Sequence, residues 1–228
     1  MSQSPLPNRP LKDAYRLLSP LYDGLAGMVL GKSFLSSPYL FLDTIRSGNQ
    51  VLVLGGGTGK NLREILNQTG ASGKVYYFES SSSMLARARN RLGPEQRVKV
   101  EFILASDFKK IPIMQADVII TQYFLDLLED KDLVLLFRQI QSRTKMGCKW
   151  IFVDFFPERK KIKWTQLMIT VFRLMTGHRR KDLPEYEPYF RHFGWEKQKE
   201  KTLKGGWIKA RLYQRMAFSI NPKISSLK

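Results

Sequence analysis

The chain has 228 residues, of which 43% are hydrophobic and 25% charged, as is usual for a one-domain globular protein. Its single cysteine, Cys148, excludes an intrachain disulfide and a cysteine-based zinc site, and so favours a reducing, cytoplasmic setting. Neither a secretory leader nor a run of about 18 apolar residues is evident, so we expect a protein that is neither exported nor integral to a membrane.

The charge is strongly basic and unevenly distributed. In total, 38 Lys and Arg residues against 20 Asp and Glu residues give a net charge of +18. Residues 151–228 hold 18 basic and 7 acidic residues, whereas residues 101–150 hold 7 of each. A solvated surface, an anionic membrane surface and nucleic acid are all compatible with such a segment, and these alternatives stay open here.

The expected domain runs from residue 11 to residue 220. Residues 1–10 contain three prolines and read as a disordered lead-in, and residues 221–228 read as a loose tail. In residues 11–46, leucines at helical spacing are interrupted by Pro20, Gly31 and Pro38, which predicts an N-terminal cap of two or three helices.

Beyond this cap, short β-rich runs alternate with helical runs, which is typical of parallel strands joined by helices. The predicted strands are 51–54, 74–78, 98–104, 117–121 and 148–155, and the predicted helices are 62–67, 84–92 and 133–145. Residues 156–190 are predicted to form a helical lid insert. In residues 195–215, Gly205 and Gly206 separate two alternating runs, which indicates a terminal antiparallel hairpin.

A glycine-rich segment, residues 54–61, follows the first predicted strand, where a tight turn and a close ligand need glycine. The dinucleotide pattern Gly-x-Gly-x-x-Gly, begun at Gly55, places Lys60 where the third glycine belongs. The phosphate-binding pattern Gly-x-x-x-x-Gly-Lys-Ser/Thr places Leu54 first and Asn61 last. Both kinds of nucleotide site are therefore disfavoured.

The pattern that remains, Gly-x-Gly-x-Gly after a Val-Leu-Val-Leu strand, resembles the first motif of class I S-adenosylmethionine-dependent methyltransferases. The resemblance implies an α/β, Rossmann-like fold with a seven-stranded sheet, six strands parallel and the last antiparallel. It also implies S-adenosylmethionine as cofactor and S-adenosylhomocysteine as product. The residues it assigns to the loop's contacts with the cofactor are Gly55, Gly56, Gly57, Thr58, Gly59 and Asn61.

In this family an acidic residue ends the second strand and binds both ribose hydroxyls. Here Glu79 ends that strand, and a carboxylate suits the task because it can accept two hydroxyl protons at once. The serine-containing turn that follows resembles the family's turn and contributes Ser80 and Met84. The resemblance therefore places Glu79, Ser80 and Met84 beside the cofactor's ribose.

Two later strand ends are assigned in the same way. Asp107 and Phe108 follow the third strand at the family's adenine-recognising place. Thr121 and Gln122 end the fourth strand beside the methionyl part and the reacting methyl group, and Tyr123 follows them. These residues complete the expected cofactor site.

One position departs from the family. Many relatives carry Asp or Glu where this chain has Val53, and that carboxylate helps to neutralise the methionyl ammonium group. Backbone carbonyls would have to take this role here. The departure raises the alternative of a non-catalytic adenosylmethionine sensor or scaffold.

Methyl transfer from a sulfonium proceeds by in-line displacement, so positioning of the acceptor dominates and only some acceptors need a base. Candidate bases are His178, His192, Tyr123 and Asp154, none fixed by spacing, and both histidines stand among basic residues as surface histidines do. Other weak catalytic candidates are Gln122 and Tyr22. The pair Tyr22-Asp23 resembles the lead-in of methyltransferases that act on quinones and phospholipid head groups.

The insert suggests where an acceptor binds. In residues 159–181, basic clusters flank an apolar stretch, Trp164 to Met175, that is too short to span a membrane. It is compatible with a lid helix packed on the core and with a helix lying in an anionic membrane interface. A lid over a lipid-like or quinone acceptor would satisfy both interpretations.

The function expected from the sequence is methylation of a small-molecule or lipid-like acceptor, such as a quinone, a phenol or a phospholipid head group. RNA methylation is the enzymatic alternative that the net charge suggests. It is disfavoured because the adenine-methylating motif Asn-Pro-Pro-Tyr or Asp-Pro-Pro-Tyr is replaced by Thr-Gln-Tyr-Phe at residues 121–124. No pattern of metal ligands is found in the sequence.

Overall fold

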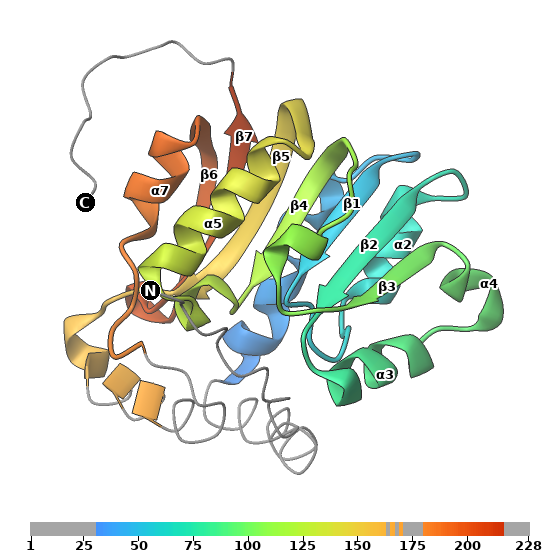
Figure 1. The fold of residues 1–228 in the computed structure, drawn as a ribbon. Helices are drawn as coiled ribbons and strands as arrows, with labels where there is room; N and C mark the ends of the chain where they lie inside the picture. Colours follow the sequence, from blue (N-terminus) through green and yellow to red (C-terminus); the bar gives the residue numbers. More distant parts are fainter. Residues whose placement is uncertain (1–30, 163–164, 167–168, 171–179, 217–228) are drawn as a thin grey trace, which may run out of the picture.

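In a computed structural model the chain is described over residues 31–162, 165–166, 169–170 and 180–216. Its centre is a seven-stranded sheet of order β3-β2-β1-β4-β5-β7-β6 (Figure 1). The strands are β1 (Gln50–Leu54), β2 (Lys74–Glu79), β3 (Val100–Leu104), β4 (Ala116–Gln122), β5 (Thr144–Phe155), β6 (Trp195–Leu203) and β7 (Ile208–Arg215). Neighbours from β3 to β5 pair in parallel, and β7 is antiparallel to both β5 and β6. This confirms the expected sheet of six parallel strands and one antiparallel strand.

Helices cover both faces of the sheet. They are α2 (Leu62–Thr69), α3 (Ser82–Asn90), α4 (Pro94–Arg97), α5 (Asp130–Gln141) and α7 (Tyr186–His192). In β1, Leu52 and Leu54 point into an apolar cluster with α5 and α7, whereas Val51 and Val53 point into a second cluster with α2. Figure 1 shows α5 and α7 in front of the sheet and α2 behind it. Burial on both faces explains why the central strands are almost continuously apolar in sequence.

Several short 3-10 helices connect these elements. They are η1 (Ser37–Tyr39), η2 (Leu42–Thr44), η3 (Phe108–Lys110), η4 (Leu125–Leu127), η5 (Arg159–Lys161) and η6 (Lys204–Gly206). The described part of the predicted N-terminal cap is helical over residues 31–36 and continues into η1 and η2. Among the described residues, no helix is long and apolar enough to cross a membrane.

Several predicted boundaries were wrong. The helix expected over 133–145 ends at Gln141, and β5 begins at Thr144. Residues 145–147 of this strand, Lys-Met-Gly, are exposed and include a single apolar residue, so they gave no strand signal. The third strand begins at Val100 and not at Val98, whose side chain is 82% exposed.

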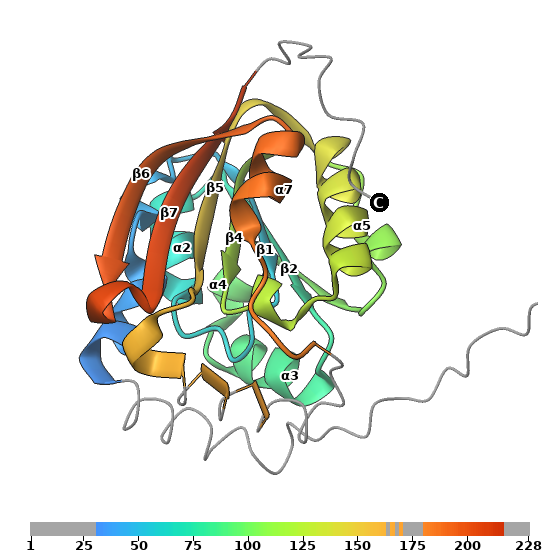
Figure 2. The same ribbon diagram turned by 90° about the vertical axis from the view of Figure 1, so that its left-hand side faces the viewer.

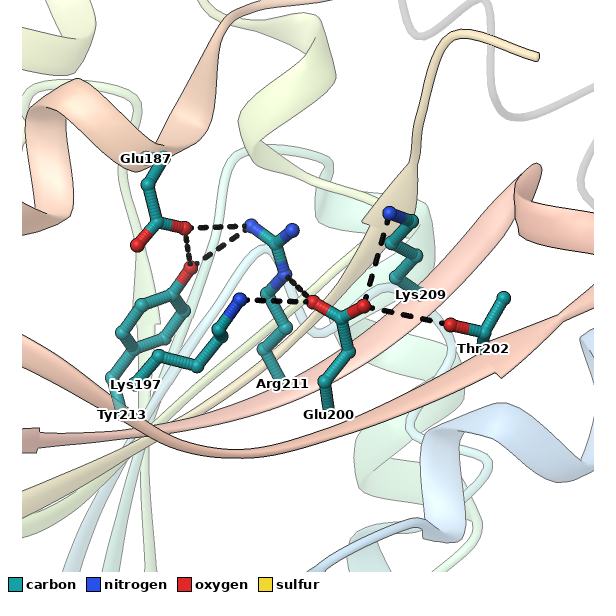
Figure 3. A network of polar contacts seen from close by, with 7 residues as sticks. All are labelled: Glu187, Lys197, Glu200, Thr202, Lys209, Arg211 and Tyr213. Carbon is teal, nitrogen blue, oxygen red and sulfur yellow. Dashed lines mark hydrogen bonds and ion pairs between the residues drawn. The ribbon is translucent and has the colours of Figure 1, made fainter.

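The predicted terminal hairpin is formed by β6 and β7, and its outer strand is the edge of the sheet (Figure 2). Here the guanidinium of Arg211 donates to Glu200 (2.7 Å), Glu187 (3.0 Å) and the Tyr213 hydroxyl (3.0 Å). Figure 3 shows that Glu187 reaches this group from α7, above the sheet. The network therefore fixes α7 to the hairpin through polar contacts.

Candidate functional site

The glycine loop leaves β1 at the point where the order of the sheet reverses. β1 lies between β2 and β4, so the connections after β1 and after β4 run to opposite faces. In open α/β sheets, ligands bind in the crevice that such a reversal leaves at the carboxyl ends of the strands. The fold therefore places residues 55–61 at the expected ligand site.

The loop's conformation requires glycine. Gly55, Gly57 and Gly59 have φ angles of 64°, 59° and 68°, a left-handed region that residues with a Cβ rarely adopt. At Gly56 the limit is space, because a Cβ would lie 2.2 Å from the ring of Tyr77. At all four positions of the motif, the structure thus explains why the residue is glycine.

Two side chains that sequence reasoning missed support this loop. The Tyr77 hydroxyl, buried beneath it, donates to the carbonyl of Gly57 (3.1 Å). Arg91, which follows α3, donates through Nε to the carbonyl of Thr58 (2.7 Å). Tyr77 occupies an ordinary core position of β2 and Arg91 an ordinary surface position, so neither carries a motif.

Glu79 lies at the end of β2 with its side chain turned toward the loop. Its carboxylate accepts the N–H of Gly57 at Oε2 (2.9 Å) and the N–H of Ser81 at Oε1 (2.8 Å), while Ser80 Oγ lies 3.5 Å from Oε1. Burial raises the pKa of Glu79, and the backbone N–H groups of Ser81 and Gly57 oppose the rise. Each carboxylate oxygen has further lone pairs, so Glu79 can still accept hydroxyl protons.

The helix after β2 begins close to Glu79. Ser81 caps α3 by accepting the N–H of Met84 (3.3 Å). The buried side chain of Met84 places its sulfur 3.7 Å from where a Cβ on Gly57 would lie. The structure thus brings Gly57, Glu79 and Met84 together, three of the residues for which the sequence predicted contact with the cofactor.

Aromatic rings pack beside the glycine loop. Phe108 is buried, with its ring centroid 6.2 Å from Phe78 and 6.3 Å from Phe124, edge to face. The ring of Phe124 packs on Gly55, where a Cβ would lie 2.2 Å from Phe124 Cδ2. Asp107 is exposed and accepts the N–H of Lys109 (2.9 Å), which leaves its other oxygen available.

Asn61 and Gln122, both predicted to contact the cofactor, make their described contacts with the cap. Asn61 donates through Nδ2 to the carbonyl of Pro38 (2.9 Å) and to Gln122 Oε1 (2.9 Å). Gln122 donates through Nε2 to the same carbonyl (2.8 Å). These two amides therefore attach the cap to the start of α2 and to the end of β4 at the rim of the site.

Neighbouring predicted residues are also engaged. Thr121 is buried, and its hydroxyl accepts the indole N–H of Trp150 (2.8 Å). The Tyr123 hydroxyl shares a hydrogen bond of 2.6 Å with the hydroxyl of Ser37. Burial raises the pKa of Tyr123, which disfavours a phenolate base.

The remaining base candidates differ in position. His192 ends α7, just before β6 begins, and therefore lies toward the amino edge of the parallel strands, away from the glycine loop. Asp154 lies on β5 at the carboxyl edge but is buried, with its oxygens occupied by backbone N–H groups. Tyr22, Asp23, His178 and most of the 164–179 stretch lie outside the described residues.

The comparisons with known proteins agree with this geometry. Residues 51–147 match a family model described as a methyltransferase domain. No curated protein matches the chain.

Solved structures share the fold at low sequence identity. The mitomycin 7-O-methyltransferase MmcR has a TM-score of 0.63 at 17% identity over 89% of this chain and 60% of its own. A SAM-dependent methyltransferase from Aquifex aeolicus has a TM-score of 0.59 at 18% identity, over 83% of this chain and 96% of its own. A putative methyltransferase of Haloferax volcanii, solved with a methyltransferase activator, has a TM-score of 0.65 at 13% identity, over 91% of this chain and 98% of its own. The chain thus spans 60% of the length of the mitomycin enzyme.

Proposed function

We propose that this chain is an S-adenosylmethionine-dependent methyltransferase that transfers a methyl group to a hydroxyl oxygen of a small-molecule or lipid-like acceptor. The fold and the glycine loop support the donor side of this proposal. The acceptor side is supported by the side chains at the carboxyl ends of β4 and β5.

The residues at the loop fit S-adenosylmethionine, whose sulfonium supplies an activated methyl group when bound. Glu79 offers a carboxylate with free lone pairs at the end of β2, and Gly55 and Gly57 present bare backbone. Phe108 and Phe124 offer apolar aromatic surface for the adenine ring and the sulfonium of the cofactor. Val53 is 3% exposed and lies in the apolar cluster with α2, so backbone carbonyls would have to take the role of the missing carboxylate toward the methionyl ammonium.

One observation carries the acceptor proposal: aromatic rings pack into a cluster where the cap meets the ends of β4 and β5. Phe34 of the cap lies 4.6 Å from Tyr123, Tyr123 lies 4.9 Å from Phe155, and Phe155 lies 5.3 Å from Trp207, centroid to centroid. Apolar aromatic surroundings at this place favour an uncharged ring or a lipid-like molecule over a polyanion.

The positions of the candidate bases narrow the acceptor further. Among the described residues, Tyr123, Asp154 and His192 are hydrogen-bonded, buried or remote from the loop. An acceptor hydroxyl that ionises readily, such as a phenol or a hydroquinone, needs the least help from a base. The names of two structural neighbours, a mitomycin 7-O-methyltransferase and an O-methyltransferase family protein from Burkholderia thailandensis, also support oxygen as the accepting atom.

The same end of the molecule supports peripheral contact with an anionic membrane on the cytoplasmic side. Leu35 and Ile162 are 45% and 51% exposed, and Lys32 and Lys160 are exposed near them in the chain. Apolar side chains among lysines are the combination that an anionic lipid surface attracts. In vesicle flotation we expect binding to phosphatidylglycerol vesicles that is lost in high salt, and equal recovery with phosphatidylcholine vesicles would contradict this.

The function is tested by incubating the protein with S-adenosylmethionine labelled in the methyl group, together with separate phenol, quinone and phospholipid fractions or total RNA. We expect label in an organic-soluble product and none in RNA. A Glu79→Gln variant serves as the control for background transfer. Label in RNA alone would replace the proposed acceptor class, and turnover with none of them would favour a binding protein without catalysis.

A further inference from the structure

Two acidic side chains meet beneath the turn that follows β4. Asp154, at 1% exposure, accepts the N–H groups of Leu125 (3.1 Å) and Asp126 (3.3 Å) at Oδ2 and the N–H of Phe155 (2.9 Å) at Oδ1. The Asp126 carboxyl lies beside it, and Asp126 Oδ1 is closed to solvent without a hydrogen-bond partner. Such a buried pair calls for an explanation, because isolated carboxylates are costly to bury.

The turn that Asp154 holds carries a wall of the cofactor site. Tyr123 begins it, donating its N–H to the carbonyl of Val153 (2.8 Å) and adopting a left-handed φ of 53°. Phe124 comes next and packs its ring on Gly55. Leu125 follows with the first N–H that Asp154 accepts. The turn is therefore fastened to β5 on both sides of Phe124, in a conformation that a non-glycine residue adopts only under constraint.

We propose that Asp154 is a positioning residue of the cofactor site, which holds Phe124 against Gly55 through the N–H groups of Leu125 and Asp126. The inference rests on the proposed use of S-adenosylmethionine. Asp154 does not touch the cofactor, and its effect on binding is exerted through the ring of Phe124.

The carboxyl pair makes this positioning sensitive to pH. Burial raises the pKa of Asp126 to about 6, and burial together with the charge of Asp126 raises the pKa of Asp154 well above its usual range. The described groups that face the pair are Tyr186 of α7, Tyr123 and the cation of Arg180. The pair thus favours sharing one proton over full ionisation, and loss of that proton as the pH rises leaves two like charges in contact.

The sign of the effect follows from linkage. Because the folded protein binds this proton more tightly than the unfolded chain does, the stabilisation is present at low pH and is lost as the pH rises through the raised pKa values. Repulsion then separates Asp154 from Asp126 and loosens the turn. Affinity for the cofactor falls in the same pH range.

Calorimetric titration with S-adenosylhomocysteine tests the positioning role in the full chain. In Asp154→Asn the amide cannot accept all three N–H groups, and we expect an affinity loss of about tenfold. Asp117→Asn is the matched control, since Asp117 accepts the N–H of Gln50 (2.8 Å) at the other end of β4. That control should bind as the unchanged protein does, and equal losses in both variants would overturn the proposal.

A double-mutant cycle separates positioning from general stability. If Asp154 acts through the ring of Phe124, Phe124→Leu and the double variant Phe124→Leu with Asp154→Asn bind equally. Additive losses would contradict the proposal. If the unchanged protein itself does not bind S-adenosylhomocysteine, the proposed function fails instead.

The pH dependence gives a readout that needs no variant at Asp154. The unchanged protein should lose affinity as the pH rises above about 6, and Asp126→Asn should show no such loss. An unchanged pH profile in Asp126→Asn would show that the pair does not control the turn.

Discussion

The glycine loop and the β6–β7 hairpin are stabilised by opposite means. The loop depends on the absence of side chains, because Tyr77 and Phe124 occupy the space next to Gly56 and Gly55. The hairpin depends on their presence, because Arg211 joins Glu187, Glu200 and Tyr213 in one network (Figure 3). The glycine loop should therefore be disrupted when atoms are added to it, and the hairpin should be destabilised when a charged side chain is removed.

Adding one methyl group in the loop should have the largest effect. In Gly56→Ala the new Cβ would lie 2.2 Å from the Tyr77 ring, which is fully buried and has no room to move. Overpacking of this kind typically costs about 1–3 kcal/mol, and the shifted loop would no longer fit the cofactor. We expect binding of S-adenosylhomocysteine to be lost, as measured by calorimetry.

The matched control is Gly93→Ala. Gly93 precedes α4 with a φ of −72°, and no atom lies within 4 Å of the position of a new Cβ. Both binding and thermal unfolding should stay unchanged. Retained binding in Gly56→Ala would show that the loop adapts and that its glycines are not sterically required.

Removing the buried cation should affect stability without affecting the cofactor. In Arg211→Met, Glu187 and Glu200 lose a partner, but their side chains are 44% and 26% exposed and regain water. We therefore expect a loss of about 1–2 kcal/mol in the free energy of unfolding, measured with urea. Lys201→Met, at an exposed position of the same hairpin, is the control and should change little. A change in cofactor affinity in Arg211→Met would contradict the separation of the two regions.

Loosening the attachment of the cap should lower both the stability and the affinity for the cofactor, each by a smaller amount than the changes above. Asn61→Ala removes the hydrogen bonds to the Pro38 carbonyl and to Gln122, while Gln122 still donates to Pro38. We expect a loss of about 1 kcal/mol in stability and a few-fold loss of affinity for S-adenosylhomocysteine. The exposed Asn90→Ala is the control. Unchanged affinity would place the cap's attachment outside the function of the site.

The smallest expected effect is that of Tyr123→Phe. The change removes the hydrogen bond between the Tyr123 and Ser37 hydroxyls but keeps the ring contacts with Phe34 and Phe155. Ser37 still donates to the carbonyl of Phe34. The thermal midpoint of unfolding should fall slightly, by less than it does in Asn61→Ala. Methyl transfer should persist, and its loss would identify Tyr123 as the base.

The sheet was predictable because its strands are buried on both faces. Val51 to Leu54 and Asp117 to Thr121 are almost entirely apolar runs, whereas the exposed start of β5 escaped notice and the start of β3 was placed two residues early. The positions of the four loop glycines and of Glu79 were also predictable, because backbone geometry and a fixed strand end determine them.

The supports of the site could not be predicted in the same way. Tyr77, Arg91 and Asp154 act through contacts with residues distant in sequence, which leave no local pattern. The amides of Asn61 and Gln122 occupy motif positions but meet the cap carbonyl of Pro38, a contact fixed only by packing.

The most direct test is calorimetric titration of the protein with S-adenosylmethionine and S-adenosylhomocysteine, repeated with Glu79→Ala. Glu101→Ala, on the exposed side of β3, is the control for loss of a carboxylate. The account predicts micromolar binding that Glu79→Ala abolishes and Glu101→Ala preserves. Absence of binding at millimolar ligand, or equal binding by Glu79→Ala, would contradict the assignment of this loop and strand end as the cofactor site.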